Sequence, residues 1–427
     1  MLHYFIKSKD NNDILFFEDG TILCGSTEKL NFEVKKRESV LFSLKKDEVN
    51  KKRLKKLILL MTEDCNLRCR YCYLDYGNFN KNNEKHGFDI IKAKEIISQI
   101  YEEFDDGVES VIFFGGEPLI SFSQIEIVLE YIIQKCEENN VLIPEFGLIT
   151  NGILLDKLKW EKLCQYHVKV KVSMDGEEYI HDMVRKDIAG NGTWNKLKSS
   201  VKERICENNE HIFFEMTLNR LHKKLLEDGG IEKCMQNFKD IGFFAGSIAC
   251  TEFSKDPSLD FQKEDIEWLK ELVSRITDYC FKEMEKDNSL FIIDIVQATL
   301  FILQKNLTDY HCYAGEKQYT ITANGDILPC TAYAHSNVKI SIKNKEFSLS
   351  DEVIKQHKCN KCWIHNFCRT FCYYRSKQRT EQNIDFDVRC VYVQAIYESV
   401  IRNVVNMYQN NKTGFLMNKL REYIQKI

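Results

Sequence analysis

The chain has little of what marks several large classes of protein. It contains only four prolines in 427 residues and no low-complexity segment, so the sequence offers no obvious linker between domains. Its longest apolar runs, such as LILLM and VIFF, are far shorter than the roughly 20 residues that cross a bilayer. Its 60 basic and 64 acidic residues leave a net charge of −4, without the basic field that binds nucleic acid. We therefore expect no membrane and no nucleic-acid partner.

The N-terminal sequence, MLHYFIKSKDNND, also lacks the long apolar region of a signal peptide, and we expect a cytoplasmic protein. Seventeen cysteines are many for that compartment. Disulfides do not persist where thiols are kept reduced, so metal binding or redox chemistry is the better interpretation. Ten of the cysteines fall into two patterned groups. We interpret most of the other seven as inert buried side chains: Cys24, Cys136, Cys164, Cys206, Cys234, Cys250 and Cys280.

Six β-rich runs alternate with longer segments of helical periodicity. The runs are KLILLMTED, ESVIFFGGEP, EFGLITNG, VKVKVSMDG, HIFFEMTLN and GFFAGSIACTEF. This alternation predicts an α/β fold of parallel strands with crossover helices, either an open doubly wound sheet or a barrel. Nearly every run ends in polar or glycine-containing residues, as expected for the catalytic face of a βα barrel. We therefore predict a partial (β/α)6 TIM-like barrel, open on one side.

Three cysteines follow the first predicted strand in the segment CNLRCRYC. They are Cys65, Cys69 and Cys72, whereas a structural tetrahedral metal site usually takes four protein ligands. Three thiolates can bind three irons of a cubic 4Fe–4S cluster and leave the fourth iron open to another ligand. A zinc knuckle is the alternative that the spacing alone leaves open.

This segment resembles the signature of the radical SAM superfamily, in which an aromatic residue, here Tyr71, precedes the last cysteine. The resemblance implies that S-adenosylmethionine (SAM) binds the open iron and is cleaved to a 5′-deoxyadenosyl radical, which takes a hydrogen atom from the substrate. It also extends to GGEP at residues 115–118, to SMDG at 173–176 and to the arginine of HDMVRK. The cofactor-binding residues that it implies are Tyr71, Gly116, Glu117, Ser173 and Arg185, with Asn151 in a supporting role.

Seven further cysteines lie between residues 312 and 390, at spacings that resemble the SPASM extension of radical SAM enzymes that modify peptides and proteins. A zinc ribbon is the alternative for four of them. The resemblance implies two auxiliary 4Fe–4S clusters, and so three clusters in all. The distal cluster would be held by Cys359, Cys362, Cys368 and Cys390, and the proximal cluster by Cys312, Cys330 and Cys372. Gln318 stands where some relatives have a fourth proximal cysteine.

These features divide the chain into five predicted regions. Residues 1–55, with a β-hairpin around Glu18-Asp19-Gly20, would form a small β-rich cap or a partial docking region for a leader peptide. Residues 56–255 would form the radical SAM barrel, 256–311 a helical connector, 312–390 a cysteine-rich SPASM domain that binds iron–sulfur clusters, and 391–427 a helical tail.

Three functions fit the sequence. The leading one is a peptide maturase of the sactipeptide or ranthipeptide type, which forms thioether crosslinks from cysteine sulfur to carbon in a ribosomal precursor peptide. Such an enzyme needs a flavodoxin- or ferredoxin-type electron donor. The second is an anaerobic sulfatase-maturating enzyme that makes formylglycine, but that family has an aspartate base where this chain has Thr331. The third is a non-catalytic iron–sulfur or zinc-binding protein.

Overall fold

The computed structural model describes residues 3–7, 12–37, 52–75, 87–286, 290–307, 312–342, 347, 359–368 and 371–426. Part of the predicted N-terminal region, residues 38–51, therefore lies outside the described residues. The chain divides into two compact units. We call Asn50–Phe261 with Tyr313–Ser348 the core unit, and Met1–Val49, Gln262–Cys312 and Leu349–Ile427 the terminal unit. No helix in the described parts of either unit is long and apolar enough to cross a membrane.

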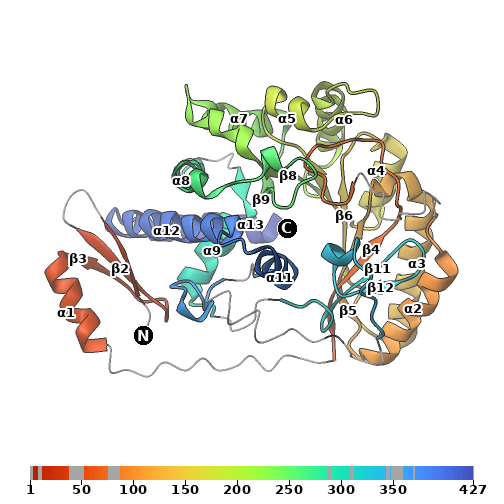
Figure 1. Ribbon diagram of the computed structural model, residues 1–427, viewed down its shortest axis with the longest axis horizontal. Coiled ribbons are helices and arrows are strands. Elements are labelled where there is room, and N and C mark those ends of the chain that lie inside the picture. Colours follow the sequence, from red (N-terminus) through yellow and green to blue (C-terminus); the bar gives the residue numbers. More distant parts are fainter. Residues whose placement is uncertain are drawn as a thin grey trace. The chain divides into compact units, whose positions relative to one another are not determined.

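The core unit is built on six parallel strands in sequence order. They are β4 (Leu54–Leu60), β5 (Val108–Phe114), β6 (Glu145–Thr150), β7 (Lys169–Ser173), β8 (Ile212–Leu218) and β9 (Ala245–Cys250). The helices that connect them are α2 (Ile90–Glu103), α3 (Phe122–Asn139), α4 (Lys157–Gln165), α5 (Glu178–Val184), α6 (Trp194–Glu207) and α7 (Gly230–Ile241). The strands line up in a linear order, and α2, α3 and α4 lie along one side of them in Figure 1. The predicted α/β fold with six strand–helix units is confirmed.

Alternation of side chains explains why these strands bury one face more fully than the other. In β7, Val170 and Val172 are fully buried, whereas Lys169, Lys171 and Ser173 are only half-buried. Successive side chains of a strand point to opposite faces, so the valines pack under the helices and the polar residues point to the other face of the sheet. Ser173 is the last residue of β7 and lies at the polar end of the strand, where the candidate site begins.

A hairpin from the cysteine-rich region extends the same sheet. Strand β11 (Gln318–Ile321) pairs in parallel with β4 and antiparallel with β12 (Ile327–Leu328). Tyr313–Ser348 thus groups with the core strands, although the sequence analysis assigned it, with the later cysteines, to a domain over 312–390. Gln318 itself is a residue of this added strand and lies opposite Lys56.

The terminal unit combines a small sheet with a group of helices. The sheet consists of β1 (His3–Ile6), β2 (Asp13–Phe17) and β3 (Ile22–Gly25). The two-residue β10 (Phe291–Ile292) belongs to the same unit but not to this sheet. The helices of the unit are α1 (Thr27–Arg37), α8 (Ile266–Met284), α9 (Ile293–Gln304), α11 (Tyr373–Gln382), α12 (Val388–Gln409) and α13 (Thr413–Lys426). The long helix α12 packs against α8 and α9 (Figure 1). The predicted hairpin is confirmed as β2–β3, and β1 pairs with its other side.

The seven cysteines outside the two groups are more varied than predicted. Four of them, Cys136, Cys234, Cys250 and Cys280, are buried, as expected for inert core side chains. Cys164 is half-buried, and Cys24 and Cys206 are exposed, so the prediction that most of the seven are buried holds for four of them. Cys24 lies on β3, at the edge of the terminal unit's sheet, where strand periodicity turns its side chain outward.

Candidate functional site

The three-cysteine loop, residues 65–72, follows the end of β4 and is held against residues 184–187. The backbone N–H of Arg68 donates to the carbonyl of Lys186 at 2.7 Å, and that of Arg70 donates to Val184 at 2.9 Å. Within the loop, the N–H of Cys72 donates to the carbonyl of Cys69 at 3.0 Å. These bonds fix the loop beside the segment that carries the predicted cofactor residue Arg185.

The thiols of this loop are electrostatically coupled. The pKa of both Cys65 and Cys69 is raised to about 12, chiefly by loss of hydration on burial and in smaller part by neighbouring cysteines of the loop. The Arg185 guanidinium acts in the opposite direction on Cys69. Two N–H groups point at the Cys65 sulfur, from Leu67 at 3.4 Å and from the Asn151 side chain at 3.8 Å. Because only a bound cation keeps such thiols deprotonated, this donor set fits an iron–sulfur cluster.

In the part of the chain that the structure describes, no three cysteine, histidine or acidic side chains converge on one metal-ion position. The ligands of a 4Fe–4S cube bind different irons and need not converge on one point.

GGEP forms a tight turn after β5 that closes on the start of the cysteine loop. Gly115 has φ +135°, and a Cβ atom there would lie 2.7 Å from the carbonyl oxygen of Thr62, so only glycine fits. The N–H groups of Gly116 and Glu117 donate to the carbonyls of Thr62 and Asp64, at 3.0 and 2.8 Å. The turn thus lies directly against the chain that leads to Cys65.

Glu117 is fully buried and joins this turn to the end of β6. Its carboxyl accepts hydrogen bonds from the Thr150 hydroxyl at 2.6 Å, the Asn151 N–H at 2.8 Å and the Leu119 N–H at 3.0 Å. Burial nevertheless raises the pKa of Glu117 to about 7, because all three donors are neutral. A cationic group placed nearby would lower that pKa, so the carboxyl is suited to an ammonium ligand.

Asp175 connects the cysteine loop with the predicted SAM residues, although the sequence pattern predicts no role for it. It follows β7 and is fully buried. Its Oδ2 accepts from the Tyr71 hydroxyl at 2.6 Å and from Nε of Arg185 at 2.9 Å, and its Oδ1 accepts from the Thr217 N–H at 2.9 Å. Although burial opposes ionisation, the Arg185 guanidinium holds the pKa of Asp175 below its ordinary value. The only signal in the sequence was an acidic residue at a strand end.

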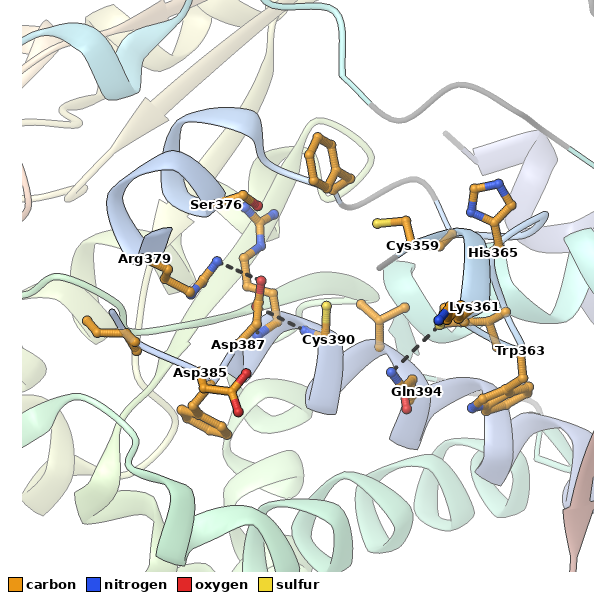
Figure 2. Close-up of a pocket in the computed structure, with 18 of the residues that line it drawn as sticks. Cys359, Lys361, Trp363, His365, Ser376, Arg379, Asp385, Asp387, Cys390 and Gln394 are labelled. Atoms are coloured by element: carbon orange, nitrogen blue, oxygen red, sulfur yellow. Dashed lines mark hydrogen bonds and ion pairs between the residues drawn. The ribbon is translucent and has the colours of Figure 1, made fainter. Parts of the chain in front are cut away.

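The four cysteines predicted for the distal cluster line one cavity of about 800 Å³ in the terminal unit (Figure 2). Cys390 lies in the first turn of α12, and the other three come from the segment 359–368. The pKa of Cys362 is raised to about 11, chiefly by burial and in smaller part by the thiols of the other three cysteines. The Gln394 side chain, one turn after Cys390, donates to the Cys362 sulfur at 3.8 Å. The structure thus brings this predicted set together.

The three cysteines predicted for the proximal cluster are divided between the units. Cys312 and Cys372 belong to the terminal unit, and Cys330 belongs to the core unit. Within the core unit, Cys330 precedes a 3₁₀ turn over Thr331–Tyr333. The imidazole Nε2 of His335, just after that turn, lies 3.0 Å from the carbonyl oxygen of Tyr73. The Cys330 segment therefore contacts the residue that follows the three-cysteine loop.

Comparison with known proteins identifies the family that the strands and the cysteine loop resemble. Residues 59–205 match the Radical SAM superfamily. The chain is 25% identical over 374 residues to a cysteine-type anaerobic sulfatase-maturating enzyme of Clostridium novyi, covering 82% of this chain and 96% of that one. It is 24% identical over 394 residues to the radical SAM cyclopropyl synthase TigE of Paramaledivibacter caminithermalis, covering 86% and 78%.

Two solved structures share the fold at lower identity. The anSMEcpe structure with bound AdoMet is 19% identical and aligns with a TM-score of 0.66, over 86% of this chain and 98% of that one. Streptococcus suis SuiB bound to its precursor peptide SuiA is 18% identical and aligns with a TM-score of 0.50, over 87% and 94%. At these identities the likeness concerns the fold alone.

Proposed function

We propose that this chain, a radical SAM enzyme related to sulfatase-maturating and peptide-modifying enzymes, forms thioether crosslinks in a ribosomally made, cysteine-rich precursor peptide. When bound, the cluster and SAM supply the 5′-deoxyadenosyl radical that removes a hydrogen atom from the substrate. Each crosslink joins a cysteine sulfur to a carbon and removes two hydrogen atoms from the peptide. The radical would take one of them from the carbon, the thiol would release its proton, and the remaining electron would pass to an auxiliary cluster. Because these relatives are enzymes, a non-catalytic binding protein is the weakest of the three proposed functions.

The chain's own residues would hold these groups as follows. Cys65, Cys69 and Cys72 would bind the SAM cluster, with the N–H groups on the Cys65 sulfur stabilising its thiolate. Glu117 and Arg185 would bind the ammonium and the carboxylate of SAM, because each has the opposite charge to its ligand. The remaining patterned cysteines would hold two auxiliary clusters, for three 4Fe–4S clusters in the chain.

The observation that carries the crosslinking proposal is the contact between His335 and Tyr73. It joins the segment that begins at Cys330 to the loop at which the radical would form, and both belong to the core unit. A substrate sulfur held near Cys330 would therefore lie close to the substrate carbon from which the hydrogen is removed. Holding both partners on one scaffold replaces a bimolecular encounter with an intramolecular one.

The small sheet of the terminal unit supplies a surface for the peptide. Its strand order is β1-β2-β3, so among the residues that the structure describes β3 is an edge strand, and its outer backbone groups pair with no other strand. An extended peptide can add to such an edge through backbone hydrogen bonds. We propose that β3 docks part of the precursor peptide, as a partial leader-binding element.

Formylglycine formation is the second candidate, and the sulfatase-maturating relatives favour it. Two residues argue against it. Thr331 stands where that family has its aspartate, and a threonine hydroxyl is too weak a base at neutral pH. Gln318, a residue of β11, stands where that family has a further cysteine.

One experiment separates the two candidates. The enzyme is incubated anaerobically with SAM, a reductant and either a cysteine-rich peptide encoded beside its gene or a peptide with the cysteine motif of sulfatases. The products are alkylated and fragmented, with a Cys72→Ala enzyme as control. We expect the first peptide to lose two hydrogens and its reactive thiols for each bond formed. An aldehyde on the sulfatase peptide, detected with a hydrazide probe, together with intact thiols on the first peptide would establish the second candidate instead.

A further inference from the structure

The buried contacts around Asp175 assign a task to this residue that does not depend on which peptide bond the enzyme makes. Its side chain accepts three hydrogen bonds, and they come from three elements of the core unit: the cysteine loop, the segment after α5 and strand β8. All three donors converge on a carboxyl with no exposed surface. A carboxylate is the only common side chain that accepts on both oxygens and donates from neither.

The bond to Arg185 determines which part of the guanidinium is available. Asp175 takes the Nε edge of Arg185, at 2.9 Å. The Tyr71 ring packs against the guanidinium, with 5.1 Å from its carbon to the ring centroid, and so fixes the plane of the group. The Arg185 side chain also hydrogen-bonds the Cys69 thiol of the cysteine loop. Its two terminal amino groups form a fork, the geometry that binds a carboxylate through paired hydrogen bonds.

The bond to Tyr71 ties this fork to the cysteine loop. Tyr71 lies between Cys69 and Cys72, and its hydroxyl shares the Oδ2 oxygen that also binds Arg185. One oxygen atom therefore fixes the guanidinium and the loop relative to each other. The backbone of Asp175 is itself held, because its N–H donates to Nδ1 of His181 at 3.3 Å and Gly176 follows with φ +78°.

We propose that Asp175 is a positioning residue: it presents the guanidinium fork of Arg185 to the carboxylate of SAM and keeps that fork in register with the three-cysteine loop. SAM affinity then depends on a residue that does not itself touch the cofactor. The proposal rests on SAM binding by the radical SAM domain and not on thioether formation.

Asp175→Asn is the direct test, because the two side chains have the same shape. The three partners are an amide N–H, a guanidinium N–H and a hydroxyl, so the new NH₂ group must face at least one donor in either orientation. We expect SAM affinity, measured by equilibrium binding to the reconstituted enzyme, to fall about 10- to 100-fold, with unchanged iron content. The KM for SAM should rise in proportion, whereas kcat at saturating SAM should change less.

Asp256→Asn is the matched control. Asp256 holds Arg70, the neighbour of Tyr71 in the same loop, at 2.6 Å, but this ion pair is about one-third exposed. Its loss should change SAM affinity by about 5-fold or less. Tyr71→Phe, which keeps the ring and removes the shared bond, should weaken SAM binding by about 2- to 10-fold.

Three results would overturn the proposal. Wild-type SAM affinity in both Asp175→Asn and Tyr71→Phe would remove the link to the cofactor. An equal loss in Asp256→Asn would show that any loosening of the loop has the same effect. Loss of iron in Asp175→Asn would assign the residue to folding of the loop. If Asp175→Asn does not fold, Tyr71→Phe decides between these outcomes by its SAM affinity at full iron content.

Discussion

Trp363 joins the N-terminal sheet of the terminal unit to the segment 359–368, and its replacement by leucine should make local opening of that sheet more frequent. Its indole stacks on Tyr4 of β1, with 4.2 Å between centroids and planes 9° apart, and meets the buried Phe16 of β2 edge-on at 5.7 Å. Aromatic pairs of this kind contribute about 0.5–1.5 kcal/mol each beyond their buried area. Loss of both corresponds to about 1–3 kcal/mol, or about 5- to 150-fold in the equilibrium constant for local opening.

Hydrogen exchange followed by mass spectrometry measures this opening directly. In Trp363→Leu, the amides of β1 and β2 should exchange faster by that factor, while those of the core strands β4–β9 should not change. Tyr408→Ala is the control, because Tyr408 lies on α12, which also carries Cys390, and is 72% exposed. Unchanged exchange in β1 and β2, or an equal increase in the control, would refute the reasoning. Affinity for the precursor peptide should fall with the same variant if β3 is the docking edge.

Two further predictions concern the core unit. The triple variant Cys65, Cys69 and Cys72→Ala should lose about 4 of about 12 irons and all 5′-deoxyadenosine formation. The control Cys206→Ala, at an exposed cysteine outside the two groups, should lose neither. Iron analysis and chromatography of 5′-deoxyadenosine test this, and residual SAM cleavage in the triple variant would contradict it. Burial raises the pKa of Glu117 from its ordinary 4.5 to about 7. The contribution of this carboxyl to stability is therefore fully present below about pH 4.5 and is lost as pH rises through 7, and the free energy of unfolding falls by about 3 kcal/mol in total. We therefore compare the melting temperatures of Glu117→Gln and the wild type without SAM. The difference, variant minus wild type, should become more positive from pH 5 to pH 8.5, and a difference that does not vary with pH would contradict this.

The parts of the site that the sequence predicts are those in which the chemistry is local along the chain. Cys65, Cys69 and Cys72 lie within eight residues, so their spacing alone indicates a shared ligand set. The strand–helix alternation is equally local, and the six parallel strands follow it in order. The hairpin at Gly20 was predictable for the same reason, because its two strands are adjacent in the sequence and its turn residues lie between them.

The parts that the sequence does not predict depend on contacts between distant segments. Asp175 looks like any strand-end acid until Tyr71 and Thr217, 104 and 42 residues away, are brought to its two oxygens. The pairing of β11 with β4 joins residues more than 250 positions apart, and no local pattern specifies that register. Gln394 is an intermediate case, because its position one turn after Cys390 on a helix was visible, but its donation to Cys362 was not.

The two buried carboxyls of the core unit differ in the charge that surrounds them, and this difference suits the two ends of an amino acid. Asp175 already has a cationic partner in Arg185, which keeps the pKa of Asp175 low, so the pair is neutral as a whole and binds Asp175 through the Nε edge of the guanidinium. Glu117 is surrounded by neutral donors only, and its pKa is raised to about 7, so a cation is what it lacks. The methionyl part of SAM carries a carboxylate and an ammonium. Its binding would give each group its missing counterpart, and we therefore expect ionisation of Glu117 to be coupled to SAM binding, with affinity decreasing as pH falls below about 7.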